Sequence, residues 1–245
     1  MSLIVNADDF GISNEVNNAI AEAFEKGYIN RTTLMTNMPY AKEAMDIARN
    51  RGFIDRVGIH LNLTSGRPIS EGISKDTVMC DANGEFTADF ARNMKTRFFL
   101  AKKTSANIEE ELTAQLEEYK RLGGTLWHVD SHHHVHTDPS VWKVLKKVLK
   151  RYPVTSVRLG RNMYKGGNPL MHIYKFLLNS SIKSFCKNKE NLFGSAQDYD
   201  NYTSGIEAGE LGNLHDKLAI EIMVHPMYDD NGTVTDSYEE LKKYI

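Results

Sequence analysis

Cysteine is scarce in this 245-residue sequence. Its two cysteines, Cys80 and Cys186, lie far apart and show no CxxC spacing. A disulfide framework and a cysteine-based zinc knuckle are therefore not expected. An excess of one charge is also missing: 30 Lys and Arg face 32 Asp and Glu, for a formal net charge of -2. Electrostatics thus favours neither nucleic acid nor an anionic membrane as a partner.

Long apolar runs are absent as well. The N-terminal stretch MSLIVNADDF is interrupted by Asp8 and Asp9 before it reaches the length of a signal peptide, and no other stretch approaches a membrane span. We therefore expect a cytoplasmic protein without a membrane partner. The hydrophobic fraction of 41% and the charged fraction of 25% are ordinary for a globular protein with a full core.

Strand-like and helix-like segments alternate along the chain. The patterns predict strands at 3–7, 29–38, 56–64, 154–159 and 218–225, and helices at 13–27, 40–51, 107–122 and 169–187. Asn107 is the expected cap of the third helix, and a further helix is expected after Asp138-Pro139. Such alternation indicates an α/β fold with a mainly parallel sheet, either a barrel or an open sheet. Without repeats or linkers, we expect one catalytic domain over 1–245, with 65–104 as an excursion.

Carboxylates and imidazoles follow several of these strands. Asp8-Asp9, His60, the run HVDSHHHVH (128–136) and His225 each come at the carboxyl end of a predicted strand. Taken singly, the aspartates could complement a helix dipole, and each histidine could belong to the core. Parallel strands, however, bring their carboxyl ends to one edge, where α/β folds bind ligands. Together these residues therefore predict a site for a divalent metal ion.

The run HVDSHHHVH holds five of the nine histidines. If it continued as an extended strand, Asp130 and alternate histidines would share one face, at spacings of roughly 7 Å. Coordination bonds are only about 2 Å long, so at most one or two of these histidines can bind one ion. Asp130 would then orient the imidazole of His132 through its second nitrogen. The run is not expected to be a purification tag, because it is internal, interrupted by other residues and followed by a capped helix.

Four spaced motifs carry a resemblance to a known family. NADDFG (6–11), GIHLNLT (58–64), HVDSHHHVH and MVHP (223–226) occur in the order seen in the YdjC-like carbohydrate deacetylases. The resemblance implies a distorted (β/α) TIM-like barrel with outer helices, often dimeric. It also implies removal of N-acetyl groups from N-acetylglucosamine units of small oligosaccharides such as diacetylchitobiose. By motif position, Asp9, His60 and His132 would hold one divalent metal ion, and Asp8 would be the catalytic base.

Other roles are less determined by the motifs. His225 is the candidate acid for the departing amine, with His134 as its rival, and both Mg²⁺ and Zn²⁺ suit the ligand set. Asn37 and Arg158 could contact sugar hydroxyls or orient Asp8, although an arginine here could equally be a structural ion-pair partner. The alternatives are another metal hydrolase, namely an amidohydrolase or a phosphoesterase, and a sugar- or metal-binding barrel without turnover.

Overall fold

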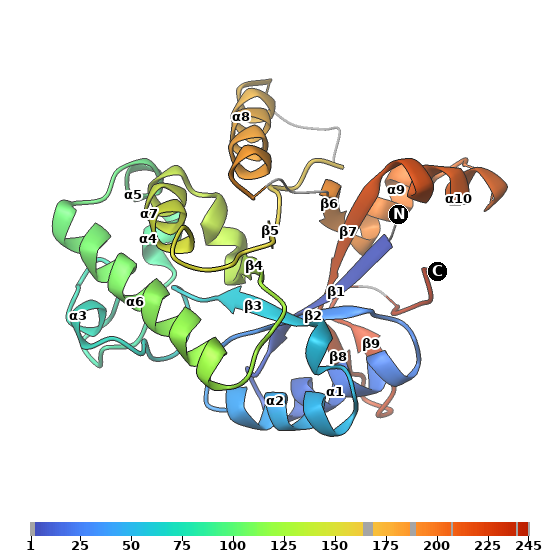
Figure 1. The fold of residues 1–245 in the computed structure, drawn as a ribbon, viewed down its shortest axis with the longest axis horizontal. Coiled ribbons are helices and arrows are strands. Elements are labelled where there is room, and N and C mark those ends of the chain that lie inside the picture. The colour runs from blue at the N-terminus through green and yellow to red at the C-terminus, as the bar shows by residue number, and fades with distance from the viewer. Residues whose placement is uncertain (1–2, 164–168, 187–189, 207, 239, 245) are drawn as a thin grey trace.

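Seven parallel strands form the central sheet, in the order β5-β4-β3-β2-β1-β7-β6 (Figure 1). The computed structural model describes residues 3–163, 169–186, 190–206, 208–238 and 240–244. The strands are β1 (Leu3–Phe10), β2 (Arg31–Leu34), β3 (Val57–Leu61), β4 (His128–Ser131), β5 (Ser156–Val157), β6 (Glu190–Ser195) and β7 (Ala219–Val224). Because all neighbours are parallel, their carboxyl ends meet at one rim of the sheet.

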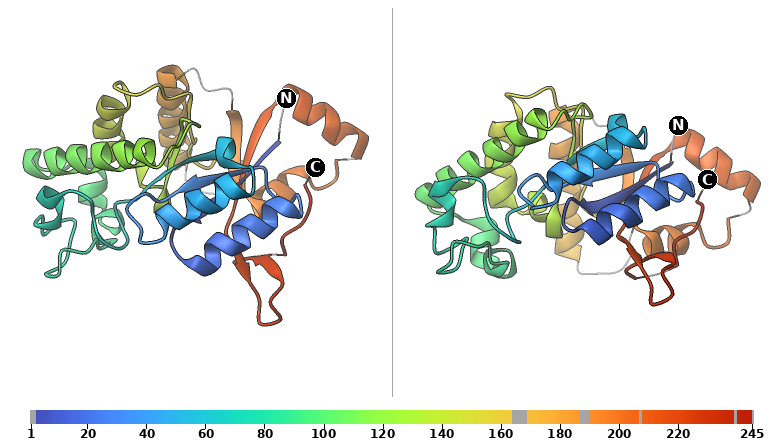
Figure 2. Two further views of the ribbon diagram at one scale, coloured as in Figure 1. Left: turned by 60° about the horizontal axis from the view of Figure 1, so that its bottom comes forward. Right: turned by 90° about the horizontal axis from the view of Figure 1, so that it is seen from below.

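Helices surround this curved sheet (Figure 2). The longer ones are α1 (Asn14–Glu25), α2 (Ala41–Asn50), α6 (Lys102–Arg121), α7 (Pro139–Leu149), α8 (Pro169–Cys186), α9 (Ala196–Thr203) and α10 (Ala208–Lys217). Strands β5 and β6 lie at opposite ends of the sheet order. The expected α/β architecture, a distorted barrel with outer helices, is confirmed.

Local sequence signals explain the first βαβ unit. The Ser13 side chain accepts a hydrogen bond from the Val16 backbone N–H, which caps α1 as the sequence predicts. Gly27 then adopts a φ of 71°, a left-handed conformation that glycine reaches without strain and that ends the helix. The inward side chains of this unit, such as Ile20 and Leu34, are completely buried in the core.

The predicted start of α6 is wrong. The helix begins at Lys102, one turn before Asn107, and the Asn107 amide donates instead to the Asp76 carboxylate at 2.9 Å. Asn107 thus fastens α6 to the preceding segment rather than capping the helix. The apolar stripe predicted the turns of α6 that pack on the core. The first turn carries no such stripe, so the sequence pattern did not predict it.

Residues 65–104 add no strand to the seven-stranded sheet. They form three short helices, α3 (Glu71–Ser74), α4 (Asp89–Arg92) and α5 (Met94–Phe98). Buried Glu111 of α6 accepts hydrogen bonds from the backbone N–H groups of Ile69 and Ser70, at 3.0 and 2.6 Å. The Glu111 carboxylate of α6 thereby provides the hydrogen-bond acceptors that a neighbouring strand would otherwise offer to these two backbone N–H groups.

A small antiparallel hairpin follows the last strand of the sheet. It consists of β8 (Pro226–Tyr228) and β9 (Val234–Asp236). The hairpin packs on α1, where the Tyr228 hydroxyl donates to the Glu22 carboxylate at 3.0 Å. Neither this hairpin nor β6, α9 and α10 was predicted from the sequence.

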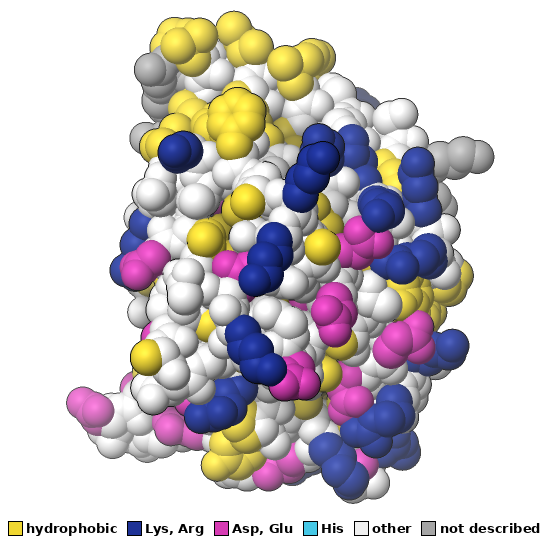
Figure 3. All heavy atoms as spheres, turned by 90° about the vertical axis from the view of Figure 1, so that its left-hand side faces the viewer, with side chains coloured by type: hydrophobic (Ala, Val, Ile, Leu, Met, Phe, Trp, Pro, Cys, Tyr) yellow, Lys and Arg dark blue, Asp and Glu magenta, His cyan; other side chains and the backbone are white. Residues whose placement is uncertain are grey.

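The outer face of α8 is apolar. Figure 3 shows apolar side chains gathered over this helix, at the top of the view. Exposed side chains on it are Leu170, Met171, Ile173, Phe176 and Leu177, whereas Leu178 and Ile182 face the core. Within the described residues, no helix combines the length and the apolar character needed to cross a membrane.

Candidate metal centre and active site

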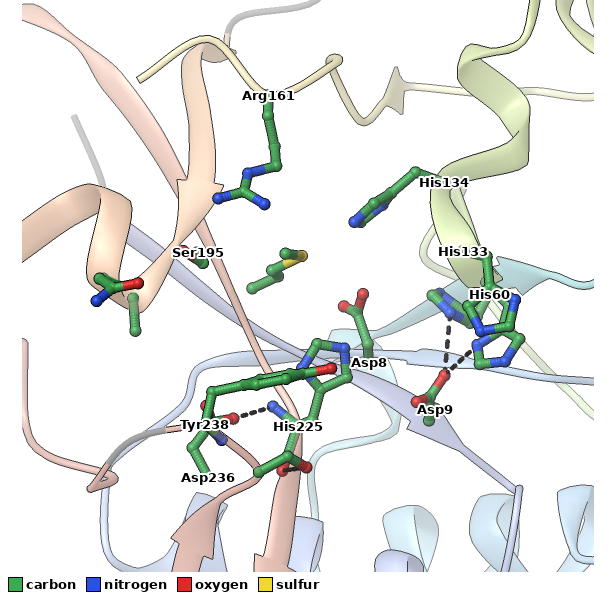
Figure 4. Close-up of a pocket in the computed structure, with 15 residues that line it drawn as sticks. Asp8, Asp9, His60, His133, His134, Arg161, Ser195, His225, Asp236 and Tyr238 are labelled. Atoms are coloured by element: carbon green, nitrogen blue, oxygen red, sulfur yellow. Dashed lines mark hydrogen bonds and ion pairs between the residues drawn. The ribbon is translucent and has the colours of Figure 1, made fainter. Parts of the chain in front are cut away.

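A cavity of about 580 Å³ opens at the carboxyl-end rim of the sheet. Ligand pockets typically have volumes of about 300–1,000 Å³. Its lining comes from strand ends far apart in the sequence and includes Asp8, Asp9, His60, His132, His133, His134, Arg161, Ser195, Gln197, Met223, His225 and Tyr238. Figure 4 shows these side chains converging on one space. The expectation that the strand ends would meet is confirmed.

Asp9, His60 and His132 form a cluster on one side of the cavity. The Asp9 Oδ1 atom lies 3.2 Å from His60 Nε2 and 2.8 Å from His132 Nδ1, drawn as dashed lines in Figure 4. One ligand atom from each residue lies within 4.8 Å of the other two. A carboxylate oxygen and two imidazole nitrogens converging in this way suit a divalent ion such as Zn²⁺. The donor set therefore fits the metal that the sequence predicts.

Asp130 sets the orientation of His60. Its Oδ1 atom lies 2.7 Å from His60 Nδ1, and both residues are completely buried. With a proton on Nδ1 facing Asp130, the Nε2 lone pair points to the cluster, as a metal ligand requires. Asp130 thus contacts an imidazole of the cluster, as the sequence suggests, but this imidazole belongs to His60, its direct neighbour on β3, and not to His132.

Glycine allows this pairing between β3 and β4. A Cβ atom added at Gly58 would lie 2.9 Å from the His128 carbonyl oxygen, closer than real Cβ contacts come. Gly58 therefore lets β3 and β4 approach closely, one pleat before His60 and Asp130. The glycine of the GIH motif thus has a packing role beside the metal cluster.

The histidine run leaves the extended conformation where the cluster begins. Strand β4 ends at Ser131, and residues His132–Thr137 form a 3-10 helix in which His133 and His134 have φ values of 52° and 55°. Asp9 has a φ of 67°. Among the described residues these are the non-glycine positions with positive φ, and all three line the cavity. Backbone strain thus gathers at the candidate site, as it commonly does at functional sites.

This turn separates the histidines that an extended strand would have aligned. His132, His133 and His134 line the cavity, whereas His136 points inward, with its Nδ1 2.6 Å from the Ser131 hydroxyl and its Nε2 3.1 Å from the Arg158 carbonyl. His128 lies beneath the rim, against the Ser156 hydroxyl at 2.7 Å. Of the five histidines of the run, His132 is the one in the metal cluster.

Beneath the cavity lies a buried group of charges, the charged floor, made of Asp8, Asp130, Arg158 and Glu221. The Arg158 guanidinium donates to both carboxylate oxygens of Asp8, at 2.6 and 2.7 Å. It also contacts Asp130 at 2.7 Å and Glu221 at 2.7 Å. All four side chains are at most 3% exposed. One guanidinium therefore contacts carboxylates from three strands, and Arg31, 2.8 Å from Glu221, adds a second positive charge, so that the two arginines offset part of the cost of burying these groups.

The pKa of Asp8 reflects this environment. Burial alone would raise that pKa, but the Arg158 guanidinium and then His60 lower it well below its ordinary value. Asp8 is therefore ionised at neutral pH, and Arg158 and the Asn6 amide, at 2.8 Å, fix its direction. Asp8 stays outside the metal cluster although Asp9 is its chain neighbour.

Two further groups of potential ligands lie in the floor. They are Asp8 with His60 and Asp130, and His128 with Asp130 and Glu221. Arg158 contacts a carboxylate in each group, so a permanent cation already compensates both. Among the described residues, Asp9, His60 and His132 are thus the group of potential ligands for which no contact with Arg158 is found.

His225 and His134 reach the cavity from different sides (Figure 4). His225 follows β7, and its backbone N–H donates to the Asp236 carboxylate. The Nδ1 atom of His134 is buried and has no hydrogen-bond partner among the described residues. Burial, and then the nearby Arg158, lower the pKa of His134 to about 3. His134 therefore stays neutral at physiological pH.

The opposite side of the cavity forms the outer wall, made of Arg161, Ser195, Gln197 and Tyr238. Arg161 donates to the Asp198 carboxylate at 2.8 Å, and Ser195 and Asp198 form a capping box at the start of α9. Sequence reasoning missed this wall. Its one sequence signal is the Ser195-to-Asp198 spacing, which predicts a helix start and no ligand.

Asn37 and Arg158, whose roles the motifs leave open, lie in different places. Arg158 contacts Asp8 directly, whereas Asn37 does not line the cavity. The Asn37 amide donates to the Arg67 carbonyl at 2.9 Å and accepts from Asn62 at 3.1 Å. Arg158, rather than Asn37, is thus placed to orient Asp8.

Comparison with known proteins points to one family. The sequence profile described as YdjC-like protein matches residues 2–244. A carbohydrate deacetylase of Geobacillus stearothermophilus is 35% identical over 229 residues, covering 93% of this chain and 80% of that protein. A carbohydrate deacetylase of Clostridium beijerinckii is 32% identical over 244 residues, covering 97% of this chain and 86% of its own length.

A solved structure has the same fold. It belongs to an Enterococcus faecalis protein described as a candidate cellobiose-phosphate cleavage protein. The two structures superpose with a TM-score of 0.66 at 24% sequence identity, over 99% of this chain and 87% of the other. At this identity the likeness supports the fold alone.

Proposed function

Because the chain belongs to the YdjC-like family, we propose that it is a metal-dependent carbohydrate deacetylase. It removes N-acetyl groups from N-acetylglucosamine units of small oligosaccharides such as diacetylchitobiose. The observation that carries this proposal is the arrangement of Asp9, His60 and His132 around one point, with the ionised Asp8 beside them but outside the cluster. Relatives named carbohydrate deacetylase support the class of substrate.

Asp9, His60 and His132 would hold one divalent ion, Mg²⁺ or Zn²⁺. Such an ion lowers the pKa of a water molecule and polarises the amide carbonyl. His60 suits this role because Asp130 fixes its tautomer, and Asp9 because its left-handed backbone turns the carboxylate toward both imidazoles. Elemental analysis of protein purified without chelator and without nickel resin would identify the ion.

Asp8 is the proposed base. It accepts a proton from water as the water oxygen bonds to the carbonyl carbon of the acetamido group. A carboxylate with a strongly lowered pKa is a weak base, so it takes this proton only from a water that has already become acidic. Arg158 holds both Asp8 oxygens and keeps the carboxylate from joining the metal cluster.

His225 is the proposed acid. As the carbon–nitrogen bond breaks, the sugar nitrogen needs a proton, which a protonated imidazole supplies. His134 is the weaker candidate because its lowered pKa, about 3, leaves it without a proton to give at neutral pH. Its buried Nδ1 could instead form a hydrogen bond with the bound substrate.

Acetate release from diacetylchitobiose tests the proposal. Wild-type protein should release acetate, and Asp8→Asn should lower kcat by roughly 10²–10⁴-fold while the bound metal is retained, because only the proton acceptor is lost. Asp76→Asn, which alters a buried carboxylate in the 65–104 segment, is the matched control and should keep full activity.

Two results would contradict the proposal. If wild type and Asp8→Asn release acetate equally, Asp8 is not the base. If neither releases acetate although both bind metal, the protein is a sugar- or metal-binding barrel without turnover.

A further inference from the structure

Tyr238 is an exposed aromatic side chain at the mouth of the cavity. It is 81% exposed and belongs to the cavity lining. Single exposed aromatic residues are common on protein surfaces and need no explanation by themselves. Tyr238 differs in its position, since its ring lies beside that of His225, as Figure 4 shows.

The backbone around Tyr238 is fastened to His225. The Asp236 carboxylate accepts hydrogen bonds from the backbone N–H groups of His225 and, at 3.3 Å, of Tyr238. The Ser237 backbone N–H and hydroxyl both donate to the His225 carbonyl, at 3.1 Å. Three hydrogen bonds therefore tie Asp236 and Ser237 to His225, and the fourth holds the Tyr238 backbone to Asp236, so the position of Tyr238 follows that of the proposed acid.

The Tyr238 ring also contacts the His225 ring. Their centroids are 5.6 Å apart and the ring planes meet at 80°, an edge-to-face arrangement. This contact restricts the tyrosine rotamer while most of the side chain remains open to solvent. A ring that is held in place before a ligand arrives loses little entropy on binding.

The chemistry of an oligosaccharide matches this arrangement. His225 would protonate the C2 nitrogen of the sugar being deacetylated, so that sugar lies beside His225, and the next sugar, joined through a glycosidic oxygen, lies one ring away. A pyranose presents C–H groups on its faces and hydroxyls around its edge. An aromatic ring accommodates such a face by burying apolar surface, and polar side chains accommodate the edge. On the same outer wall, Arg161 and Gln197 supply the polar groups.

We propose that Tyr238 is a specificity-determining residue, whose ring stacks against the second sugar of an oligosaccharide substrate. This inference rests on the proposed deacetylase function and deepens it. It assigns the preference for oligosaccharides over the single sugar to one residue. Acetyl transfer to water itself needs no contact with Tyr238, so N-acetylglucosamine gains nothing from the ring.

Three variants and two acetylated substrates test this assignment. Tyr238→Ala removes the ring, Tyr238→Phe keeps the ring and removes the hydroxyl, and Phe99→Ala removes a 77% exposed ring that is not part of the cavity lining. The steady-state constants kcat and KM for acetate release are measured with N-acetylglucosamine and with diacetylchitobiose.

Tyr238→Ala should raise KM for the disaccharide by about three- to tenfold, the range expected for one aromatic contact. This rise should exceed any change in KM for the monosaccharide by the same factor, because the single sugar does not reach the ring. Tyr238→Phe and Phe99→Ala should resemble wild type. The assignment is overturned if Tyr238→Ala keeps the wild-type ratio of the two KM values, or if Tyr238→Phe loses as much as Tyr238→Ala.

Calorimetric binding of glucosamine and chitobiose, which carry no acetyl group to be hydrolysed, separates this inference from the proposed function. If wild type releases no acetate but Tyr238→Ala still weakens chitobiose binding selectively, the deacetylase proposal fails and the stacking role stands. If acetate is released and the variant binds chitobiose like wild type, only the stacking role fails. If wild type neither releases acetate nor binds these sugars, both fail.

Discussion

Arg158 and Arg161 lie three residues apart in the chain but belong to different parts of the cavity. Arg158 is completely buried in the charged floor, where it contacts three carboxylates. Arg161 is 41% exposed on the outer wall and contacts one carboxylate, that of Asp198. The same side chain is thus a fixed structural element in one place and an adjustable surface group in the other.

This difference suggests a division of tasks between the two parts. The charged floor and the metal cluster fix the direction and charge of the groups that would act on the amide bond. The outer wall offers exposed groups that can adapt to the rest of the substrate. Precise chemistry favours buried, fully hydrogen-bonded residues, whereas recognition of a sugar chain tolerates exposed ones.

The largest expected contrast concerns stability. Arg158→Met should lower the free energy of unfolding by about 3–5 kcal/mol, because the buried Asp8 and Asp130 carboxylates lose the guanidinium that contacts them. Arg161→Met should cost less than about 1 kcal/mol, since Arg161 is 41% exposed and Asp198 keeps its hydrogen bonds in the capping box. Urea denaturation of both variants measures this difference. Equal losses of stability would show that the charged floor and the outer wall do not differ in this respect.

Acid sensitivity should also differ between a histidine buried beneath the rim and one nearer the surface. Burial, the largest effect, lowers the pKa of His136 to about 4. Between about pH 6.5 and pH 4 the unfolded chain therefore binds a proton that the folded protein does not, so stability falls as the pH falls through this range. At about 1.4 kcal/mol per pKa unit, the loss is on the order of 2–3 kcal/mol.

Removing His136 tests that prediction. His136→Gln should flatten the fall in stability between pH 6.5 and pH 4, as measured by urea denaturation of chelator-treated protein. His215→Gln is the control from α10, where the histidine is bonded to the Tyr199 hydroxyl and is far less buried. A steeper or unchanged pH profile for His136→Gln would contradict the assignment.

Metal affinity should depend on the buried partner of His60. Asp130→Asn should weaken metal binding by roughly 10–100-fold, because the imidazole loses the charge that fixes its tautomer and raises its basicity. Competition with a fluorescent chelator measures this affinity. Asp198→Asn, on the far side of the cavity, should leave the metal affinity unchanged. A loss of metal affinity in this variant would contradict the contrast between the charged floor and the outer wall.

The smallest predicted effect lies at the start of α9. Ser195→Ala should lower the free energy of unfolding by about 1 kcal/mol, since it removes one half of the capping box with Asp198. Ser195→Thr keeps the hydroxyl and should restore most of that stability. If thermal unfolding gives the alanine and threonine variants the same stability, the cap contributes nothing.

The sequence predicted the metal cluster because parallel topology limits where strand ends can lie. Asp9 and His60 lie in the last residues of their strands and His132 directly after its strand, so one rim collects them. The choice of these three residues as ligands came from the resemblance of the motifs. The partner of Asp130 could not be predicted, because it depends on the chain leaving the extended conformation at His132. No pattern in HVDSHHHVH shows that turn.

The outer wall escaped prediction for a related reason. Tyr238 follows β9, a strand of only three residues, which holds too few side chains to show a period, and Arg161 lies beyond the end of the strand that the sequence predicts at 154–159. Their position depends on contacts between distant segments, such as the hydrogen bonds of residues 236–238 with His225. Long, periodic elements are readable from sequence, and short strands fixed by long-range contacts are not.

The left-handed backbone at Asp9 restricts which substitutions evolution could accept there. Besides glycine, Asn, Asp and His are the residues that adopt such a conformation most readily, and the three strained positions of the site hold one Asp and two His. Glutamate could offer the same carboxylate but would enter this conformation at greater cost. The amino acids that can replace Asp9 are therefore limited first by the backbone conformation and only then by the need for a metal ligand.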